Sequence, residues 1–169
     1  SLTFLLFINF NAFGEEIKGH ARVIDGDSLE IKGIKIRLHG IDAPEIKQKC
    51  KDSKNNTWKC GLESKVLLEK LVSDNVIICN GDKRDRYNRL IAKCYFNSID
   101  LQSWLILKGL AIVYSKYSLE YIYEENIAKA NKVGIWKGDF ISPEKWRSIK
   151  RIESSKKKAE GSESNKCCR

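Results

Sequence analysis

The sequence predicts an α+β domain in which about five short strands are combined with three helices. Residues 17–41 and 75–96 alternate apolar and polar side chains, and a period of two is typical of half-buried strands. Between and after these regions lie segments with the apolar spacing and capping residues of helices. A chain of 169 residues with 42% hydrophobic content is expected to form one globular domain.

The strands are expected in two groups. In residues 17–41, Asp25-Gly26-Asp27 separates the first runs, and Ile34, Ile36 and Leu38 alternate with polar neighbours. Residues 75–96 predict two further strands, which could pair as a hairpin across residues 81–88. A shorter strand is expected at residues 110–114.

The helices are predicted from amphipathic spacing and from capping residues. Residues 61–72 form an amphipathic segment. Ser98 is expected to cap a second helix, and Ser118 a third, which runs toward residue 132 and ends at Gly134.

A further helix start lies near the C-terminus, at Ser142-Pro143-Glu144. Proline suits the first helical position, and an acidic residue suits the first turn. Residues 154–169 are polar and charged, so we expect a basic, disordered tail. The folded domain is therefore placed at residues 15–153.

Residues 1–14 carry no charged side chain, and residues 2–13 are almost wholly apolar. This segment is too short to span a bilayer, and it matches the apolar core of a secretory signal peptide, with Ala12 and Gly14 near a cleavage site. A buried strand or an uncleaved anchor is the alternative. We expect a secreted or periplasmic protein, with no stable membrane insertion after cleavage.

Six cysteines agree with an oxidising compartment. Cys50 and Cys60 bracket a polar loop, whereas Cys79 and Cys94 lie on the two runs of the expected hairpin. We predict the disulfides Cys50–Cys60 and Cys79–Cys94. Metal ligation is the competing account, but the sequence has no CxxC pair and no matching histidine spacing.

The net charge of +9 indicates a polyanionic partner. The last sixteen residues carry five basic and two acidic side chains, which leaves +6 on residues 15–153. The basic balance therefore belongs to the folded part and suits a nucleic acid. A merely soluble basic protein is the alternative reading of charge alone.

Three motifs carry the chemistry: IDGDSL at residues 24–29, RLHGIDAPE at 37–45 and DRYNR at 85–89. Two acidic turns can build a site for a hard cation, and two arginines can hold a phosphate beside it. Together they indicate hydrolysis of a phosphodiester. Taken alone, IDGD is also typical of a hairpin turn with Asx hydrogen bonds.

In this order and at these intervals, the motifs resemble the staphylococcal nuclease (thermonuclease) family, and the similarity covers residues 17–137. The resemblance implies a five-stranded OB-type barrel, whose closure the periodicity alone does not predict. It also implies calcium-dependent endo- or exonucleolytic hydrolysis of DNA and RNA that leaves 3′-phosphate and 5′-hydroxyl ends.

The resemblance further implies a set of site residues. Asp27, Asp42 and the main-chain carbonyl of Ala43 match the family's Ca²⁺ ligands, although the family often has threonine at the last position. Asp25 is expected to support the turn.

The catalytic residues are carried over in the same way. Arg37 and Arg89 match arginines that stabilise charge on the phosphate, and Glu45 matches the residue beside the attacking water, as a general base or as a positioning group.

Substrate contacts are implied for Tyr87, Tyr114 and Tyr117, which match aromatic residues near the nucleotide. Stacking gives affinity for any base, so we expect single-stranded DNA and RNA as partners, without strong sequence preference, and a monomeric enzyme. A non-catalytic OB-type binding module is the rival reading, and the joint presence of Asp27, Asp42 and the three catalytic residues argues against it. A membrane-tethered nuclease is the third reading, if the leader is not cleaved.

Overall fold

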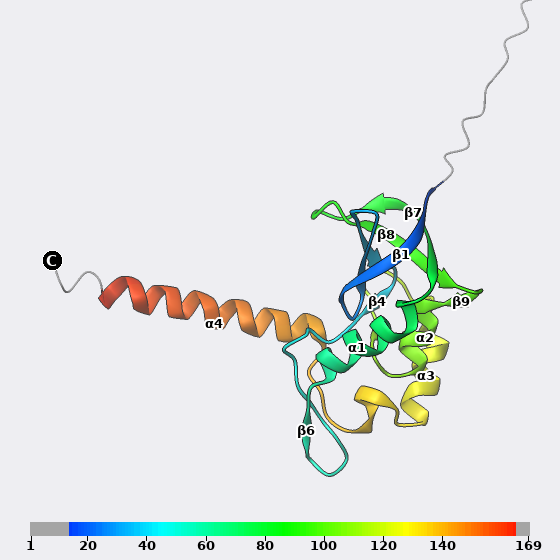
Figure 1. Cartoon of the computed structure of the whole chain (residues 1–169). Helices are drawn as coiled ribbons and strands as arrows, with labels where there is room; N and C mark the ends of the chain where they lie inside the picture. The colour runs from blue at the N-terminus through cyan, green and yellow to red at the C-terminus, as the bar shows by residue number, and fades with distance from the viewer. Residues whose placement is uncertain (1–13, 165–169) are drawn as a thin grey trace, which may run out of the picture.

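The structure is a computed structural model that describes residues 14–164, and a closed β-barrel forms its centre (Figure 1). Five strands run in the order β3-β2-β1-β7-β8, and β3 also pairs with β8, which closes the barrel. The strands are β1 (Glu15–Asp25), β2 (Ser28–Ile31), β3 (Ile34–Leu38), β7 (Val76–Arg84) and β8 (Leu90–Phe96). The expected five-stranded barrel is confirmed.

The alternation seen in the sequence fills the barrel. Leu29, Ile31, Ile36 and Leu38 are at most 1% exposed, while the polar residues between them face outward. Neighbouring strands are antiparallel except β3 and β8, which are parallel. A parallel pair needs a long crossover connection, and here the crossover contains the first helix.

The helices number four in the described residues, the three of the predicted fold class and a fourth at the helix start predicted near the C-terminus, and a 3₁₀ turn, η1 (Gly134–Lys137), follows the third. Helices α1, α2 and α3 lie together on one side of the barrel, as Figure 1 shows. Their bounds are α1 (Cys60–Val72), α2 (Leu101–Leu107) and α3 (Ile122–Ala130). The amphipathic segment predicted at 61–72 is therefore confirmed as α1.

Two of the predicted capping residues are wrong. Asp100, not Ser98, caps α2, because its carboxylate accepts a hydrogen bond from the Ser103 amide at 3.0 Å. The Ser118 hydroxyl accepts from the Glu120 amide at 3.1 Å, so it stabilises a turn that precedes α3 rather than the helix itself. In both cases a polar side chain close to the helix made the wrong start plausible.

Short strands complete the fold next to the barrel. β4 (Ile41–Asp42) pairs with β10 (Ile112–Val113), which is the remnant of the strand predicted at residues 110–114. β5 (Cys50–Lys51) pairs with β6 (Thr57–Trp58), and β9 (Ile99–Asp100) extends the sheet beside β8. The pairing of β4 with β10 holds Asp42 in place.

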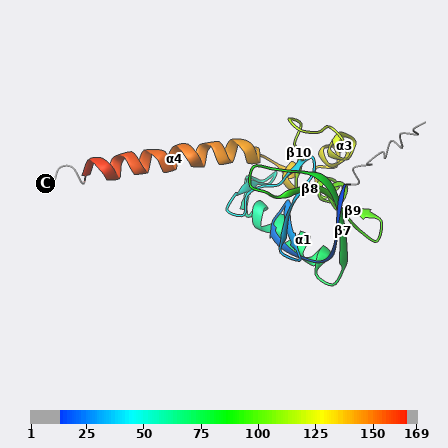
Figure 2. The same cartoon turned by 90° about the horizontal axis from the view of Figure 1, so that it is seen from above.

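The fourth helix, α4 (Pro143–Ser164), projects away from the barrel, as Figures 1 and 2 both show. Its start was predicted, but its length contradicts the disorder expected from residue 154. Lysine, alanine and glutamate are good helix formers, and Lys150 pairs with Glu153 at 2.8 Å along the helix. These local preferences sustain a helix that buries little.

Both predicted disulfides, Cys50–Cys60 and Cys79–Cys94, are present. The second joins directly paired positions of β7 and β8 inside the main core. Of the predicted leader, only Gly14 lies within the described residues. Cys167 and Cys168 lie outside them. Between residues 14 and 164, no helix combines the length and the apolar character needed to cross a membrane.

Candidate active site

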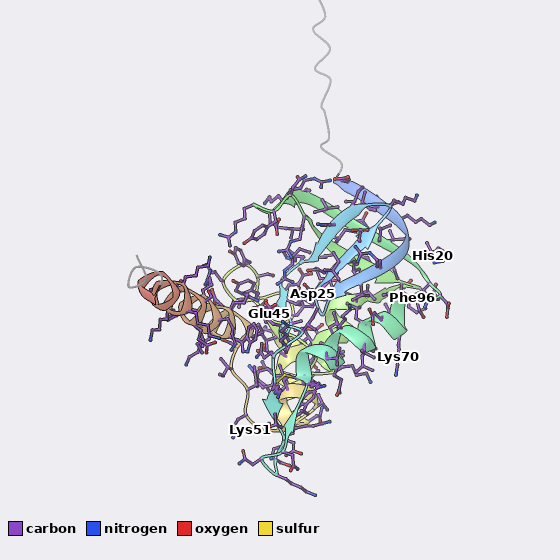
Figure 3. All side chains as sticks on the ribbon, turned by 60° about the vertical axis from the view of Figure 1, so that its left-hand side comes forward. His20, Asp25, Glu45, Lys51, Lys70 and Phe96 are labelled. Atoms are coloured by element: carbon purple, nitrogen blue, oxygen red, sulfur yellow. A yellow bond between two sulfur atoms is a disulfide. The ribbon has the colours of Figure 1, made fainter. Side chains whose placement is uncertain are left out.

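The acidic motifs meet at one end of the barrel. Asp27 lies in the turn between β1 and β2, and Asp42 ends β4. Both are buried, at 7% and 1% exposed. In Figure 3, Asp25 and Glu45 lie at the end of the barrel that faces the start of α4, whereas His20 lies on the opposite side. The strand ends therefore gather the carboxylates that the sequence placed in separate turns.

Asp27 joins the two acidic motifs through its carboxylate. Its Oδ2 accepts a hydrogen bond from the Ala43 amide at 2.8 Å, and its Oδ1 accepts one from the Ser28 hydroxyl at 3.1 Å. The Asp27 amide in turn donates to Asp25 Oδ1 at 3.1 Å. Asp25 thus supports the turn, as expected for an Asx interaction.

Arg37 lies between the two buried aspartates. Its guanidinium contacts Asp27 Oδ2 at 2.9 Å and Asp42 Oδ1 at 3.1 Å. Strand β3 presents this side chain beside the β1–β2 turn, because Arg37 is the register partner of Ser28. One arginine therefore bridges both acidic turns.

Arg89 approaches the same group from the β7–β8 turn. Its Nη1 donates to the Ser28 hydroxyl at 3.1 Å, and the same hydroxyl donates to Asp27. Asp85 orients Arg89, because its Oδ2 accepts a hydrogen bond from Arg89 Nε at 2.7 Å. Burial alone would raise the pKa of Asp85, but the hydrogen bonds from Arg89 and Tyr87 hold it below its usual value.

Glu45 sits on a tightly packed loop after β4. Its amide donates to the Gln48 side chain at 3.2 Å, and Gln48, which is fully buried, donates to the Ile141 carbonyl at 2.6 Å. Gly61, in the first turn of α1, approaches so closely that a Cβ there would lie 1.7 Å from the Glu45 carbonyl oxygen. The loop is thus fixed by the start of α1.

Arg147 of α4 is a member of the site that the motifs did not indicate. It binds Asp42 through both guanidinium Nη atoms, at 3.0 and 2.9 Å, and Glu45 at 2.9 Å. The only signal in the sequence is a basic segment after a helix start, which does not reveal where the helix docks.

One hydrogen-bonded network therefore connects every predicted catalytic residue with both predicted carboxylate ligands. It runs from Arg89 through Ser28 to Asp27, then through Arg37 to Asp42, and through Arg147 to Glu45. The predicted residues from three separate motifs therefore converge at one end of the barrel.

Electrostatics in this network are dominated by burial. Burial raises the pKa of Asp42, and Arg147 and Arg37 act in the opposite direction. Burial and the charge of Asp27 raise the pKa of Asp25 to about 7. Burial alone would lower the pKa of Arg147, but hydrogen bonds to Asp42 and Glu45 raise it overall. The negative charge of the buried acids Asp27 and Asp42 is thus balanced by arginine side chains that lie within hydrogen-bonding distance of them.

The three tyrosines flank the network on two sides. Tyr87 is 64% exposed, and the guanidinium groups of Arg86 and Arg89 lie over its ring. Tyr114 lines a small pocket that also includes Asp42. Tyr117, 68% exposed, packs edge-on against Tyr114 with ring centroids 4.8 Å apart. Tyr87 and Tyr114 therefore border the network, and Tyr117 packs against the second of them.

A hard cation fits this chemistry. The donors are carboxylate and carbonyl oxygens, which are the ligands that hard cations prefer. Among residues 14–164 there is no cluster of three or more His, Cys, Asp or Glu suited to a metal ion. A cation would therefore rely on Asp27, Asp42, the Ala43 carbonyl and water.

Comparison with known proteins identifies the family of the chain. Residues 35–138 match the family model described as staphylococcal nuclease homologue. The chain is 35% identical over 139 residues to the succinoglycan biosynthesis protein ExoI of Rhizobium meliloti, covering 80% of this chain and 73% of that protein.

Two further relatives are named as endonucleases. An uncharacterised endonuclease of Haemophilus influenzae is 32% identical over 160 residues, covering 88% of this chain and 83% of that protein. Endonuclease YncB of Bacillus subtilis is 30% identical over 128 residues, covering 68% and 59%. The family match spans more than half of the chain and includes most of the network. The chain therefore belongs to the staphylococcal nuclease family and is a nuclease.

Proposed function

We propose that the chain is a Ca²⁺-dependent nuclease that hydrolyses DNA and RNA to fragments with 3′-phosphate and 5′-hydroxyl ends. The observation that carries this proposal is the network that joins Arg89, Asp27, Arg37, Asp42 and Glu45 at one end of the barrel. Five residues drawn from three separated motifs converge there, as a phosphodiesterase requires.

The two arginines supply charge stabilisation. Attack on a phosphodiester adds charge to oxygens that are already anionic, so preorganised cations are the strongest catalytic means available. Arg37 and Arg89 are each held by an aspartate, which keeps their planar donor groups oriented. In this role a lysine could not present the same paired hydrogen bonds.

Glu45 orients or deprotonates the attacking water. Its side chain is a third exposed, so water reaches it, while its backbone is fixed by Gln48. A base that is both accessible and rigidly placed suits in-line attack opposite the 5′-oxygen. Cleavage of that bond leaves the phosphate on the 3′ side and needs no ribose 2′-hydroxyl.

Asp27, Asp42 and the Ala43 carbonyl would hold the cation, which when bound supplies positive charge to the phosphate oxygens. The hydrogen bond that the Ala43 amide donates to the Asp27 carboxylate keeps these groups adjacent. The all-oxygen character of the set favours Ca²⁺ over softer ions.

The substrate is proposed to be single-stranded nucleic acid of any sequence, bound by a monomer. Exposed Tyr87 and Tyr117 offer faces for base stacking, and the net charge of +9 attracts the backbone. Two disulfides favour action in an oxidising compartment, which agrees with export.

A chelator-controlled assay tests this function. Hydrolysis of denatured DNA should cease in a calcium chelator and return with added Ca²⁺, and Asp27→Asn should need far more Ca²⁺ to reach half of its maximal rate. Asp82→Asn, a neutral control at an exposed acid, should behave as the unmodified protein. Full activity without any divalent cation contradicts the proposal.

A further inference from the structure

Helix α4 places the positively charged side chain of Arg147 among the acids where the proposed Ca²⁺ would bind. Both oxygens of Asp42 accept hydrogen bonds from Arg147, at 3.0 and 2.9 Å, and Oδ1 also accepts one from Arg37 at 3.1 Å. The Asp42 carboxylate is 1% exposed, so no free face of it remains for another ligand.

A bound Ca²⁺ needs carboxylate oxygens at about 2.3–2.6 Å. In this structure the Arg147 guanidinium occupies the space beside the Asp42 oxygens that the ion would take. The local charges are three acids, Asp27, Asp42 and Glu45, against Arg37 and Arg147, which leaves −1 by formal count. If a divalent cation bound without displacing an arginine, the cation and the guanidinium groups would contact the same buried carboxylate oxygens and repel each other. Displacing one guanidinium avoids this repulsion.

Of the two arginines, Arg147 is the one that can leave. Arg37 lies within the barrel sheet and is 13% exposed, whereas Arg147 is 34% exposed on a projecting helix. Neither buried core cluster among the described residues includes a residue of α4. Among the described residues, a 3.3 Å hydrogen bond from the Tyr114 hydroxyl to Glu144 also joins the helix to the barrel side.

We propose that Arg147 is a tethered competitor of the cation, so that Ca²⁺ binding at Asp42 displaces Arg147 and releases the start of α4 from the barrel. This inference rests on the cation site of the proposed function. The consequence is a reciprocal coupling, because docking of Arg147 weakens Ca²⁺ binding by the same factor by which bound Ca²⁺ weakens the docking. Metal binding thereby opens Glu45, which also binds Arg147.

Calorimetric titration of Ca²⁺ into the substrate-free protein tests the competition. Arg147→Gln should bind Ca²⁺ at least about fivefold more tightly than the unmodified chain, the lower end of usual coupling factors. Arg151→Gln is the matched control, because it removes the same charge from an exposed position one turn further along α4. It should leave the affinity unchanged.

A second measurement uses the unmodified full chain, so that it does not depend on how well a variant folds. Hydrogen exchange of the amides in residues 144–150 should accelerate when Ca²⁺ is added, while exchange in β1 and β2 should slow or remain unchanged. Exchange in the same α4 segment of Arg147→Gln should already be fast without Ca²⁺.

The outcomes separate this inference from the function on which it rests. Equal or weaker Ca²⁺ binding by Arg147→Gln, or slower exchange in α4 on adding Ca²⁺, overturns the competition and leaves the nuclease proposal intact. Absence of Ca²⁺ binding by both proteins overturns the competition together with the proposed cation. Tighter binding together with faster exchange supports it.

Discussion

At the scale of single residues, Asp25 is the acid whose ionisation the fold opposes most clearly. Burial and then the charge of Asp27 raise its pKa from 3.8 to about 7. Between these values the folded protein keeps a proton that the unfolded chain has already released. Stability therefore falls as pH rises from about 4 to about 7.

Replacing Asp25 by Asn should remove this pH dependence. In chelator, Asp25→Asn should be more stable than the unmodified protein at pH 8, by an amount on the order of 1–4 kcal/mol, and the difference should shrink toward pH 4. Asn retains the oxygen that accepts from the Asp27 amide. Urea unfolding across pH measures the effect, and a stability difference that does not vary with pH contradicts the account.

The two motif arginines should affect turnover more than binding. Arg89→Ala should lower kcat by roughly 10²–10³-fold, the scale for one preorganised donor, with a much smaller change in KM. Arg86→Ala on the same turn is the control, because Arg86 contacts Tyr87 rather than the buried acids. If Arg89→Ala raises KM and leaves kcat intact, the arginine binds substrate without stabilising the transition state.

At the scale of elements, the start of α1 determines where Glu45 lies. A Cβ at Gly61 would lie 1.7 Å from the Glu45 carbonyl oxygen, and backbone on both sides leaves no flexible group to yield. Gly61→Ala should therefore destabilise the protein by about 1–3 kcal/mol and lower kcat as the loop shifts. Thermal unfolding and steady-state kinetics would detect both changes. Unaltered kcat in a destabilised variant would show that Glu45 is not held by this contact.

The Cys79–Cys94 disulfide joins β7 to β8 across a loop of 15 residues. The double replacement of both cysteines by serine should cost about 3 kcal/mol on a chain-entropy estimate, while the fold is retained because backbone pairing of the strands continues on both sides of the disulfide. Denaturant unfolding under non-reducing conditions checks this. A stability equal to that of the disulfide-bonded protein contradicts the estimate.

Elements with strong local patterns could be predicted, and those that depend on distant partners could not. The strands around the barrel and α1 follow their hydrophobic periodicity. Closure depends on the parallel pairing of β3 with β8, which joins residues more than fifty positions apart and leaves no local trace. The caps at Ser98 and Ser118 were misplaced because several polar residues near each helix compete for the same amides.

At the scale of the whole molecule, the site combines residues of the three sequence motifs with one residue, Arg147, that the position of α4 brings to them. The residues of the three motifs were assigned from the sequence, because they lie on strand ends and turns whose roles the family pattern carries over. Arg147 could not be found in this way, because its position depends on how α4 leaves the domain. A helix with few apolar contacts thus completes the group of charges around Asp42.

In the proposed mechanism, this network directs water onto phosphorus opposite the 5′-oxygen. End-group analysis of a short DNA oligomer digested in the presence of Ca²⁺ is the decisive measurement. The expected products carry 3′-phosphate and 5′-hydroxyl ends, and Glu45→Gln should form them at a strongly reduced rate. Products that carry 5′-phosphates would contradict the account.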